Sequence, residues 1–339
     1  MGRLSLAAVL FLTTTTISAS PITSQQSIKR DGVALNITSE TFFNGTCTPE
    51  SVAVKKEWRN LTDVEKKAYI DAELCLMAAP SVTDLPGVES RYDDLQALHQ
   101  YFTNTSEGDI IHNVGQFLPF HRYFMNVHAE VLKSECNYTG VLPWWDEGLD
   151  AASGNFFQSN MWDDVTGFGG NGTEADHCVR SGPFANRTMH IGPDEETTNY
   201  CFTRIWNNAV IEQAGAASVA ECYANNDYES FWPCAWGGPH SAGHGGTGGV
   251  MIDVAASPGD PMFFMHHTYL DRIWWQWQQI NATSRLYGMG GNTTTSEPAT
   301  GWVTTTLDYV LSSYGIIPNV TIDEVMNIQG GYLCYEYEY

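Results

Sequence analysis

Histidine is the residue type that offers most chemistry in this 339-residue chain, which contains ten of them. His240 and His244 lie four positions apart in PHSAGHGG. On a helix this spacing turns both rings toward one side, where they can bind the same ion. His267 belongs to the double histidine of DPMFFMHHTYLDRIWWQW, of which only one ring normally faces a given site. We predict that His240, His244 and His267 form one metal-binding set, the second histidine group.

Three residues nearer the N-terminus are predicted to form a first histidine group. His112 and His121 are nine positions apart, so their rings would point to opposite sides of one continuous helix. Pro119 interrupts such a helix. We therefore expect His112 to reach the site from a loop, and His121, in the aromatic run FLPFHRYF, to reach it from a helix. His99, on a short helix before them, can supply the third nitrogen.

Two sets of three imidazoles narrow the choice of metal. Such sites suit copper, zinc or iron rather than calcium or magnesium, and three protein ligands leave one coordination position open. No carboxylate joins either group at an obvious spacing, which argues against iron held by two histidines and a carboxylate. The sequence also lacks the HExxH motif of many zinc hydrolases. A zinc hydrolase, which would need a general base beside a metal-bound water, is an alternative that metal analysis would test.

The elements that must position these histidines are predicted from the apolar pattern. Helical spacing occurs in residues 54–79, 93–102, 120–134 and 267–280. Thr62 can cap the second half of the first stretch, and Pro119 is well placed to start the third. Residues 145–235, polar and rich in glycine, are expected to be loops tied by disulfides, and residues 302–339 to contain short strands. The sequence thus predicts a mainly α domain with long loops and a small helix bundle as its core.

The first thirty residues have the features of a secretory leader. Residues 1–20 combine Arg3, a short apolar run and a small-residue exit, which is the pattern of a signal peptide. Residues 21–30 end in the dibasic pair Lys29-Arg30, so the mature chain is predicted to be a single domain spanning 31–339. No later stretch is apolar enough to cross a bilayer. The formal charge of −23 disfavours nucleic acid and anionic membranes as partners.

Cysteines and glycosylation motifs also indicate a secreted, extracellular protein. The eight cysteines are widely scattered without C-x-x-C pairs, which in an oxidising compartment predicts up to four disulfides whose pairing stays open. Ten Asn-x-Ser/Thr motifs predict substantial N-glycosylation. They lie at Asn36, Asn44, Asn60, Asn104, Asn137, Asn171, Asn186, Asn281, Asn292 and Asn319.

Four motifs together resemble the tyrosinase and catechol oxidase family of type-3 copper proteins. They are FLPFHRYF preceded by IIH, YTGVLPWWD at 138–146, HSAGH, and DPMFFMHHTYLDRIWWQW at 260–277. The last is the most specific, because it combines Asp-Pro, an aromatic pair, a double histidine and Asp-Arg four residues on. The resemblance spans about residues 95–278, and the pattern is most like that of the short secreted fungal polyphenol oxidases.

The resemblance implies a four-helix bundle that holds two copper ions and uses dioxygen as co-substrate. His99, His112 and His121 would bind the first copper, and His240, His244 and His267 the second. His266 would then stand beside the ligands without binding metal, and Asp271 can pair with Arg122. The implied reaction oxidises small o-diphenols, and in some members o-aminophenols, to o-quinones while oxygen is reduced to water. Some members also hydroxylate monophenols. The oligomeric state stays open.

Several family features are absent. Many members link a cysteine to the second histidine of the first site, but Ile110 and Thr103 occupy the usual positions, so we expect no thioether bridge. Many also carry a C-terminal lid domain. This sequence ends at Tyr339, soon after the Tyr335-x-Tyr337 pattern that closes the core domain in relatives, so we expect no such lid.

Two positions bear on substrate choice. Val254 lies thirteen residues before the last ligand, where some catechol oxidases have phenylalanine, and its small size should leave the first copper accessible. Ser241 follows His240 at a position where hydroxylating members often have asparagine. We therefore expect diphenol oxidation and leave monophenol hydroxylation open. A glutamate that holds a water near this site in some relatives has no obvious counterpart.

A haemocyanin-like dioxygen carrier is the alternative, because haemocyanins use the same six-histidine centre. The short chain, Val254 and the lack of an obvious shielding domain favour an enzyme. Of the remaining histidines, we expect His128 to be structural or at the surface, and His177 and His190 to face solvent. His266 is expected to hydrogen-bond a backbone carbonyl.

Overall fold

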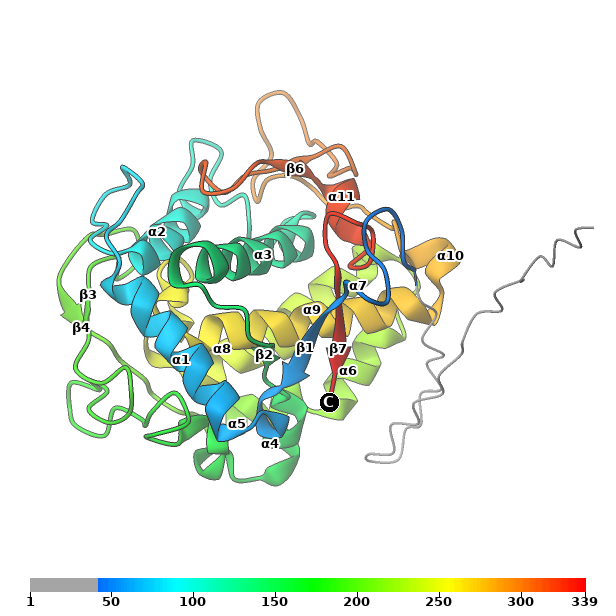
Figure 1. Cartoon of the computed structure of the whole chain (residues 1–339). Helices are drawn as coiled ribbons and strands as arrows, with labels where there is room; N and C mark the ends of the chain where they lie inside the picture. The colour runs from blue at the N-terminus through cyan, green and yellow to red at the C-terminus, as the bar shows by residue number, and fades with distance from the viewer. Residues whose placement is uncertain (1–41) are drawn as a thin grey trace, which may run out of the picture.

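The computed structural model describes residues 42–339. The predicted signal peptide, the pro-segment and Asn36 lie outside the described residues. Four long helices dominate: α1 (Asp63–Ala78), α2 (Arg91–Thr103), α3 (Phe117–Cys136) and α9 (Met262–Ile280). Helices α3 and α9 pack against each other in the middle of the molecule, α1 packs on α2 and α3, and the short α8 (Ser241–Thr247) packs on α9 (Figure 1). The fold is mainly α, as predicted, with a helical core.

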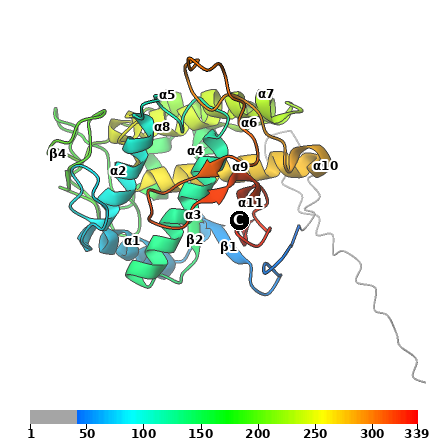
Figure 2. The same cartoon turned by 90° about the horizontal axis from the view of Figure 1, so that it is seen from above.

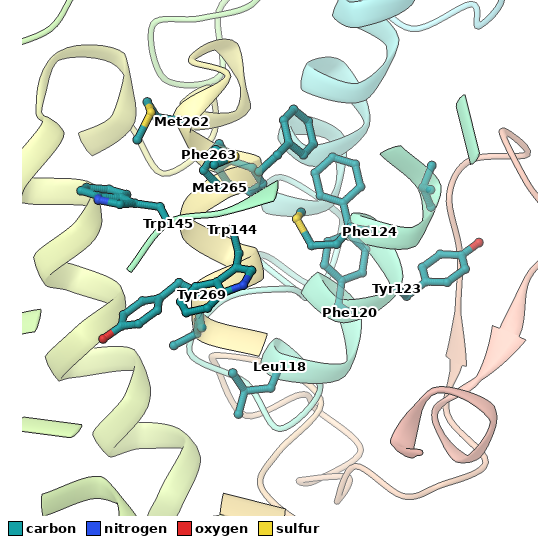
Figure 3. Close-up of a cluster of buried hydrophobic side chains, with 14 of the residues drawn as sticks. Leu118, Phe120, Tyr123, Phe124, Trp144, Trp145, Met262, Phe263, Met265 and Tyr269 are labelled. Carbon is teal, nitrogen blue, oxygen red and sulfur yellow. The ribbon is translucent and has the colours of Figure 1, made fainter. Parts of the chain in front are cut away.

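Long aromatic side chains fill the space between α3 and α9. Figure 3 shows Phe120 and Phe124 of α3 on the side that faces Phe263 of α9, and the rings of Phe124 and Phe263 lie 5.9 Å apart. Trp144 and Trp145 are also fully buried in this core. Such rings bury a large apolar area each, so they fix the two histidine-bearing helices against each other.

Residues 54–79 are a helix only in part, which corrects the prediction. Ala53–Glu57 forms strand β1, Trp58–Asn60 forms one 3₁₀ turn (η1), and α1 begins at Asp63. Thr62 caps α1 as expected, in a reciprocal capping box with Glu65. Strand β1 pairs in parallel with β2 (Leu142–Trp144) and with β7 (Tyr335–Glu338) in the order β2-β1-β7. Pairing with residues far along the chain therefore overrides the local helical pattern.

The other three helices were predicted, but each begins earlier than expected. Helix α2 begins at Arg91 behind a Ser90–Asp93 capping box, and α9 begins at Met262. Helix α3 begins at Phe117 rather than at 120, so Leu118 is helical despite the following proline. Pro119 sits in the first turn, where its missing N–H costs no hydrogen bond.

The region 145–235 is not all loop, which is a second correction. It contains α4 (Glu147–Ser153), α5 (Asn208–Ile211), α6 (Ala216–Tyr223) and α7 (Tyr228–Ala235), and the short turns η2 (Phe156–Gln158), η3 (Asn160–Trp162) and η4 (Glu212–Ala214). These helices are too short to give a clear period in the sequence. Between Trp162 and Asn207 the chain is loop apart from the two-residue strands β3 (Thr188–Met189) and β4 (Tyr200–Cys201).

The C-terminal part returns to the core: β7 pairs with β1, and α11 (Ile322–Met326) packs on α3, beside which Figure 2 shows it. This part also contains α10 (Ala282–Arg285), β5 (Val310–Leu311) and β6 (Val320–Thr321), which agrees with the short strands expected there. Tyr335 and Tyr337 of β7 both donate hydroxyl hydrogen bonds to Asp271 of α9. The end of the described chain is thereby fastened to the helix that carries His267.

Four disulfides pair all eight cysteines, as the even count predicted. They are Cys47–Cys334, Cys75–Cys136, Cys178–Cys201 and Cys222–Cys234. The first ties the beginning of the described chain to its end, and the last joins α6 to α7. In residues 42–339 no helix is both long and apolar enough to cross a bilayer.

Nine of the ten glycosylation motifs fall in the described residues, and glycosylation itself stays a prediction. Eight of the nine asparagines are exposed. The exception, Asn171, is half-buried, and its side-chain oxygen accepts a hydrogen bond from the backbone of Trp206.

Candidate metal centre

The structure brings each predicted histidine group together. His99 lies on α2, His112 in the loop before α3, and His121 on α3, as expected. Their ligand atoms lie within 4.8 Å of one another. Pro119 does not separate the last two by ending a helix; His112 simply precedes its start.

The second histidine group comes from two stretches of helix: the continuous segment formed by η5 (Trp236–His240) and α8, and the separate helix α9. His240 ends the π-helical turn η5, His244 lies on α8, and His267 lies on α9. Their ligand atoms, together with one from His266, also lie within 4.8 Å of one another. The HxxxH spacing therefore acts on one helix face, as predicted, and the helix ends at Gly248, which has a φ of 64°.

The two groups adjoin. The rings of His121 and His267 lie 4.2 Å apart, and Phe117 and Phe263 each contact histidines of both groups. Both phenylalanines are fully buried. The arrangement can hold two ions side by side in a site that buried aromatic rings shield from water.

Hydrogen bonds fix the orientation of four of the six rings through Nδ1. Three of these atoms contact backbone carbonyl oxygens: His99 with Ala255 at 3.0 Å, His121 with Phe117 at 2.8 Å and His244 with Met251 at 2.5 Å. A ring whose Nδ1–H is donated to a carbonyl carries its lone pair on Nε2. That tautomer is the one that can bind a metal through Nε2.

His112 is held by a carboxylate instead. Its Nδ1 lies 2.9 Å from Asp109, whose other oxygen accepts the backbone N–H of His112. Asp109 was not predicted from the sequence, although a carboxylate that accepts the second ring N–H of a metal-binding histidine is a common support.

Unpartnered nitrogens show that the residues fit a metal. Nε2 of His99 and of His121 is buried and has no hydrogen-bond partner among the described residues, and both ring nitrogens of His240 and His267 are in the same condition. Leaving a buried polar atom unpaired costs about 1–3 kcal/mol. Several such atoms converging on two points are explained if each point is occupied by a metal ion.

Burial also keeps these rings neutral, which is the state that binds metal. Burial first, and then the neighbouring imidazoles, lower the pKa well below 6.5 for five of the six: His99, His121, His240, His244 and His267. A neutral ring has a free lone pair, so no proton must leave before an ion binds at neutral pH.

His266 does not contact a backbone carbonyl as expected. Its Nδ1 contacts the carboxylate of Glu147, the first residue of α4, and both side chains are fully buried. Burial lowers the pKa of His266 to about 3. Burial, followed by Asp146 and Asp150, raises the pKa of Glu147 well above its usual value. Glu147 directly follows the WWD motif, and only the distant pairing with α9 reveals its partner.

Gly243 makes this approach possible. A Cβ at this position of HSAGH would lie 2.1 Å from Nδ1 of His266 and 2.7 Å from a carboxylate oxygen of Glu147. The glycine between two candidate ligands is therefore needed because the buried pair lies directly against α8.

Arg122 and Asp271 pair as predicted. Nε of Arg122 on α3 lies 2.5 Å from the carboxylate of Asp271 on α9, and both side chains are buried. The guanidinium also donates to the carbonyls of Val325 and Met326 and stacks 3.7 Å over Trp274. The pair joins the two helices one residue from His121 and four from His267.

The remaining histidines lie outside both groups. His128 is buried, 2.9 Å from Glu73 and stacked on Phe264, which is a structural role. His177 is exposed and His190 is half-buried. Val254 is 54% exposed, and Ser241 is also exposed. Because all eight cysteines are in disulfides, none is available for a thioether to His112.

The fold is that of a helical protein in which two adjoining histidine groups could each hold a metal ion. The model of the common central domain of tyrosinase matches residues 89–280, more than half of the chain. The chain therefore belongs to the tyrosinase family. That family is one of type-3 dicopper enzymes, so this protein is a copper-dependent oxidoreductase of the polyphenol oxidase kind.

Individual relatives agree. A tyrosinase-like protein, phomQ1 of Diaporthe leptostromiformis, is 34% identical over 311 residues, which cover 84% of this chain and 77% of that protein. Tyrosinase P of Aspergillus terreus is 30% identical over 345 residues, covering 85% and 92%. N-acetyl-6-hydroxytryptophan oxidase ivoB of Emericella nidulans is 29% identical over 350 residues, covering 86% and 94%.

Solved structures show the same architecture. A polyphenol oxidase from Thermothelomyces thermophila, mutant G292N, superposes with a TM-score of 0.78 at 27% identity over 86% of this chain and 90% of that one. The Grenache (Vitis vinifera) polyphenol oxidase has a TM-score of 0.53 at 15% identity, covering 94% and 98%, and supports the fold alone.

Proposed function

We propose that this protein is a secreted polyphenol oxidase that oxidises o-diphenols, and by the same chemistry o-aminophenols, with dioxygen. His99, His112 and His121 bind one copper ion, and His240, His244 and His267 bind the other. The observation that carries the proposal is the convergence of buried, unpartnered imidazole nitrogens in two adjoining groups. Two copper ions bound there would supply dioxygen binding and electron transfer from the phenol.

The reaction balances without another reductant. Two o-diphenols lose two electrons and two protons each and become o-quinones, and one O2 takes up the four electrons and four protons as two waters. The chain's own residues orient the histidine rings and exclude water from them. Phe117 and Phe263 keep bulk water from the rings, and the Nδ1 contacts hold the ligating tautomers.

Oxidation should be faster than hydroxylation of monophenols. The hydroxyl of Ser241, next to His240, already donates to the carbonyl of Trp236 at 2.9 Å. It therefore has less hydrogen-bonding capacity left for a bound water or phenol than an asparagine amide would have at that position. Val254, small and exposed, leaves access for the ring of the substrate.

Secretion is supported by the leader pattern and by the four disulfides, which persist in oxidising compartments.

The haemocyanin-like carrier is not favoured, because the relatives named above are tyrosinases and oxidases. Oxygen uptake with catechol and then with tyrosine tests the proposal. We expect uptake with catechol and a slower rate with tyrosine. Reversible oxygen binding without turnover would favour the carrier instead.

A further inference from the structure

The indole of Trp236 contacts one histidine of each group. Its ring lies 4.5 Å from that of His240 at an interplanar angle of 23°, and 5.6 Å from that of His112. It also packs edge-on against Phe117 at 4.9 Å. Trp236 therefore reaches from the second histidine group across to the first.

Trp236 is more exposed than the other aromatic residues that contact both histidine groups. In residues 42–339 three aromatic side chains other than histidine have ring contacts with both groups: Phe117, Phe263 and Trp236. Both phenylalanines are fully buried, whereas Trp236 is only half-buried. Gly237 beside it is exposed, and a Cβ there would meet nothing within 4 Å. The indole thus lies where the dry wall of the centre meets solvent.

The backbone holds this indole in place. Trp236 begins η5, and its carbonyl accepts both the backbone N–H and the hydroxyl of Ser241. Single π-helical turns are rare and occur often at functional sites. Here the turn stacks the ring of Trp236 on that of His240 four residues later, while the two bonds from Ser241 fix the carbonyl.

We propose that Trp236 is a specificity-determining residue, whose indole forms the apolar wall against which the ring of an uncharged phenol packs at the mouth of the dicopper centre. The inference rests on the proposed function and deepens it, since it names neutral o-diphenols with small apolar substituents as the favoured substrates. A flat, half-buried aromatic ring fits such a substrate. Catechols that carry a carboxylate are disfavoured, because the apolar face of the indole offers a carboxylate no partner and the chain has a formal charge of −23.

Steady-state oxygen uptake by Trp236→Leu, Trp236→Phe and the parent enzyme tests the proposal with catechol and 4-methylcatechol. An aromatic contact is worth about 0.5–1.5 kcal/mol, so KM should rise about 2- to 12-fold in the leucine variant. The effect should fall on KM more than on kcat, and the phenylalanine variant should recover most of the loss. Copper per chain, measured on the same samples, should stay at the parent value. Phe157→Leu removes a ring that is 50% exposed and is stacked on Trp206 instead of a histidine, and it should leave KM unchanged.

The parent enzyme supplies a test that does not depend on the folding of a variant. Its KM for 3,4-dihydroxybenzoate should be at least about tenfold above that for 4-methylcatechol, and added salt should narrow the difference. Equal KM values for the two substrates would overturn the specificity role of Trp236. So would an unchanged KM in copper-loaded Trp236→Leu, or a loss of copper from that variant. None of these outcomes would contradict the proposed oxidase function of the parent enzyme. A copper-loaded parent enzyme that consumes no oxygen with either catechol would contradict the proposed function, and the inference with it.

Discussion

The ring of His121 lies parallel to the ring of His267, with centroids 4.2 Å apart and an interplanar angle of 10°. His121 comes from α3 and His267 from α9, so the contact joins the two proposed copper sites through the two central helices. It also explains why a histidine stands in the apolar run FLPFHRYF. The ring is buried in an aromatic wall that would exclude water from the two proposed copper sites.

Replacing His121 tests the ligand assignment at the first histidine group. His121→Ala removes a buried nitrogen that no described residue satisfies, so we expect copper to fall from two to one per chain and oxidase activity to be lost. Elemental analysis and oxygen uptake check both. His177→Ala removes an exposed histidine outside both groups and should retain two coppers. Full occupancy and turnover in His121→Ala would show that the ligand is another residue.

Gly243 tests the packing behind the second histidine group. In Gly243→Ala the new Cβ would lie 2.1 Å from Nδ1 of His266, so α8 or His266 must shift. Changes next to metal ligands typically cost about 10–100-fold in metal affinity, and we expect a loss of that size at the second group. A copper titration against a competing chelator measures it. Gly237→Ala, whose Cβ would meet nothing within 4 Å, is the matched control; equal affinities in the two variants would refute this account of Gly243.

The buried pair of Arg122 and Asp271 should matter for stability more than a surface pair. Burial alone would raise the pKa of Asp271, but Arg122 and then Lys55 lower it below 3.8. Removing one partner of a buried ion pair costs about 3–5 kcal/mol, so Asp271→Ala should lower the free energy of unfolding by that amount. Denaturant unfolding measures it. Asp71→Ala breaks the exposed pair with Lys67 and should cost less than about 1 kcal/mol. Similar losses in the two variants would contradict the structural role.

The copper-free protein should lose stability in mild acid. The folded-state pKa of five ligand histidines is depressed well below 6.5, so below that pH the unfolded chain binds protons that the folded chain does not. Stability therefore rises with pH through this range and falls as pH drops below about 6.5. Glu147, whose pKa is raised, has the opposite sign but is a single group.

Urea unfolding of the copper-free protein at several pH values checks this expectation. The midpoint should fall steeply between pH 7 and pH 5, and saturating copper should reduce the dependence near neutral pH, because only the folded state offers the complete site. A midpoint that does not change between pH 7 and pH 5 would show that these five rings are not buried in the neutral form.

Local spacing made the two histidine groups predictable from the sequence, whereas long-range packing hid the residues that hold them in place. In HSAGH, FLPFHRYF and the double histidine, the direction of each ring depends on its position within a single helix, which the sequence reports directly. Strand β1 was predicted as helix because its partners lie about 90 and 280 residues away in the sequence. No local pattern reports such pairing.

The same limit applies to the carboxylates around the site. Asp271 was predicted because it lies one turn after His267 on the same helix. Glu147 contacts His266 across 119 residues of sequence, and nothing in WWDEGLD indicates that partner. Trp236 was likewise not predicted, because its position depends on a π-helical turn that no sequence pattern announced.

Counting copper and oxygen together on the purified parent protein tests the central claim most directly. We predict two copper ions per chain and the consumption of one O2 for every two catechols oxidised. A protein that binds zinc in preference, that holds two coppers without consuming oxygen, or that reaches full activity with a single copper would contradict the assignment of the two histidine groups as one dicopper oxidase centre.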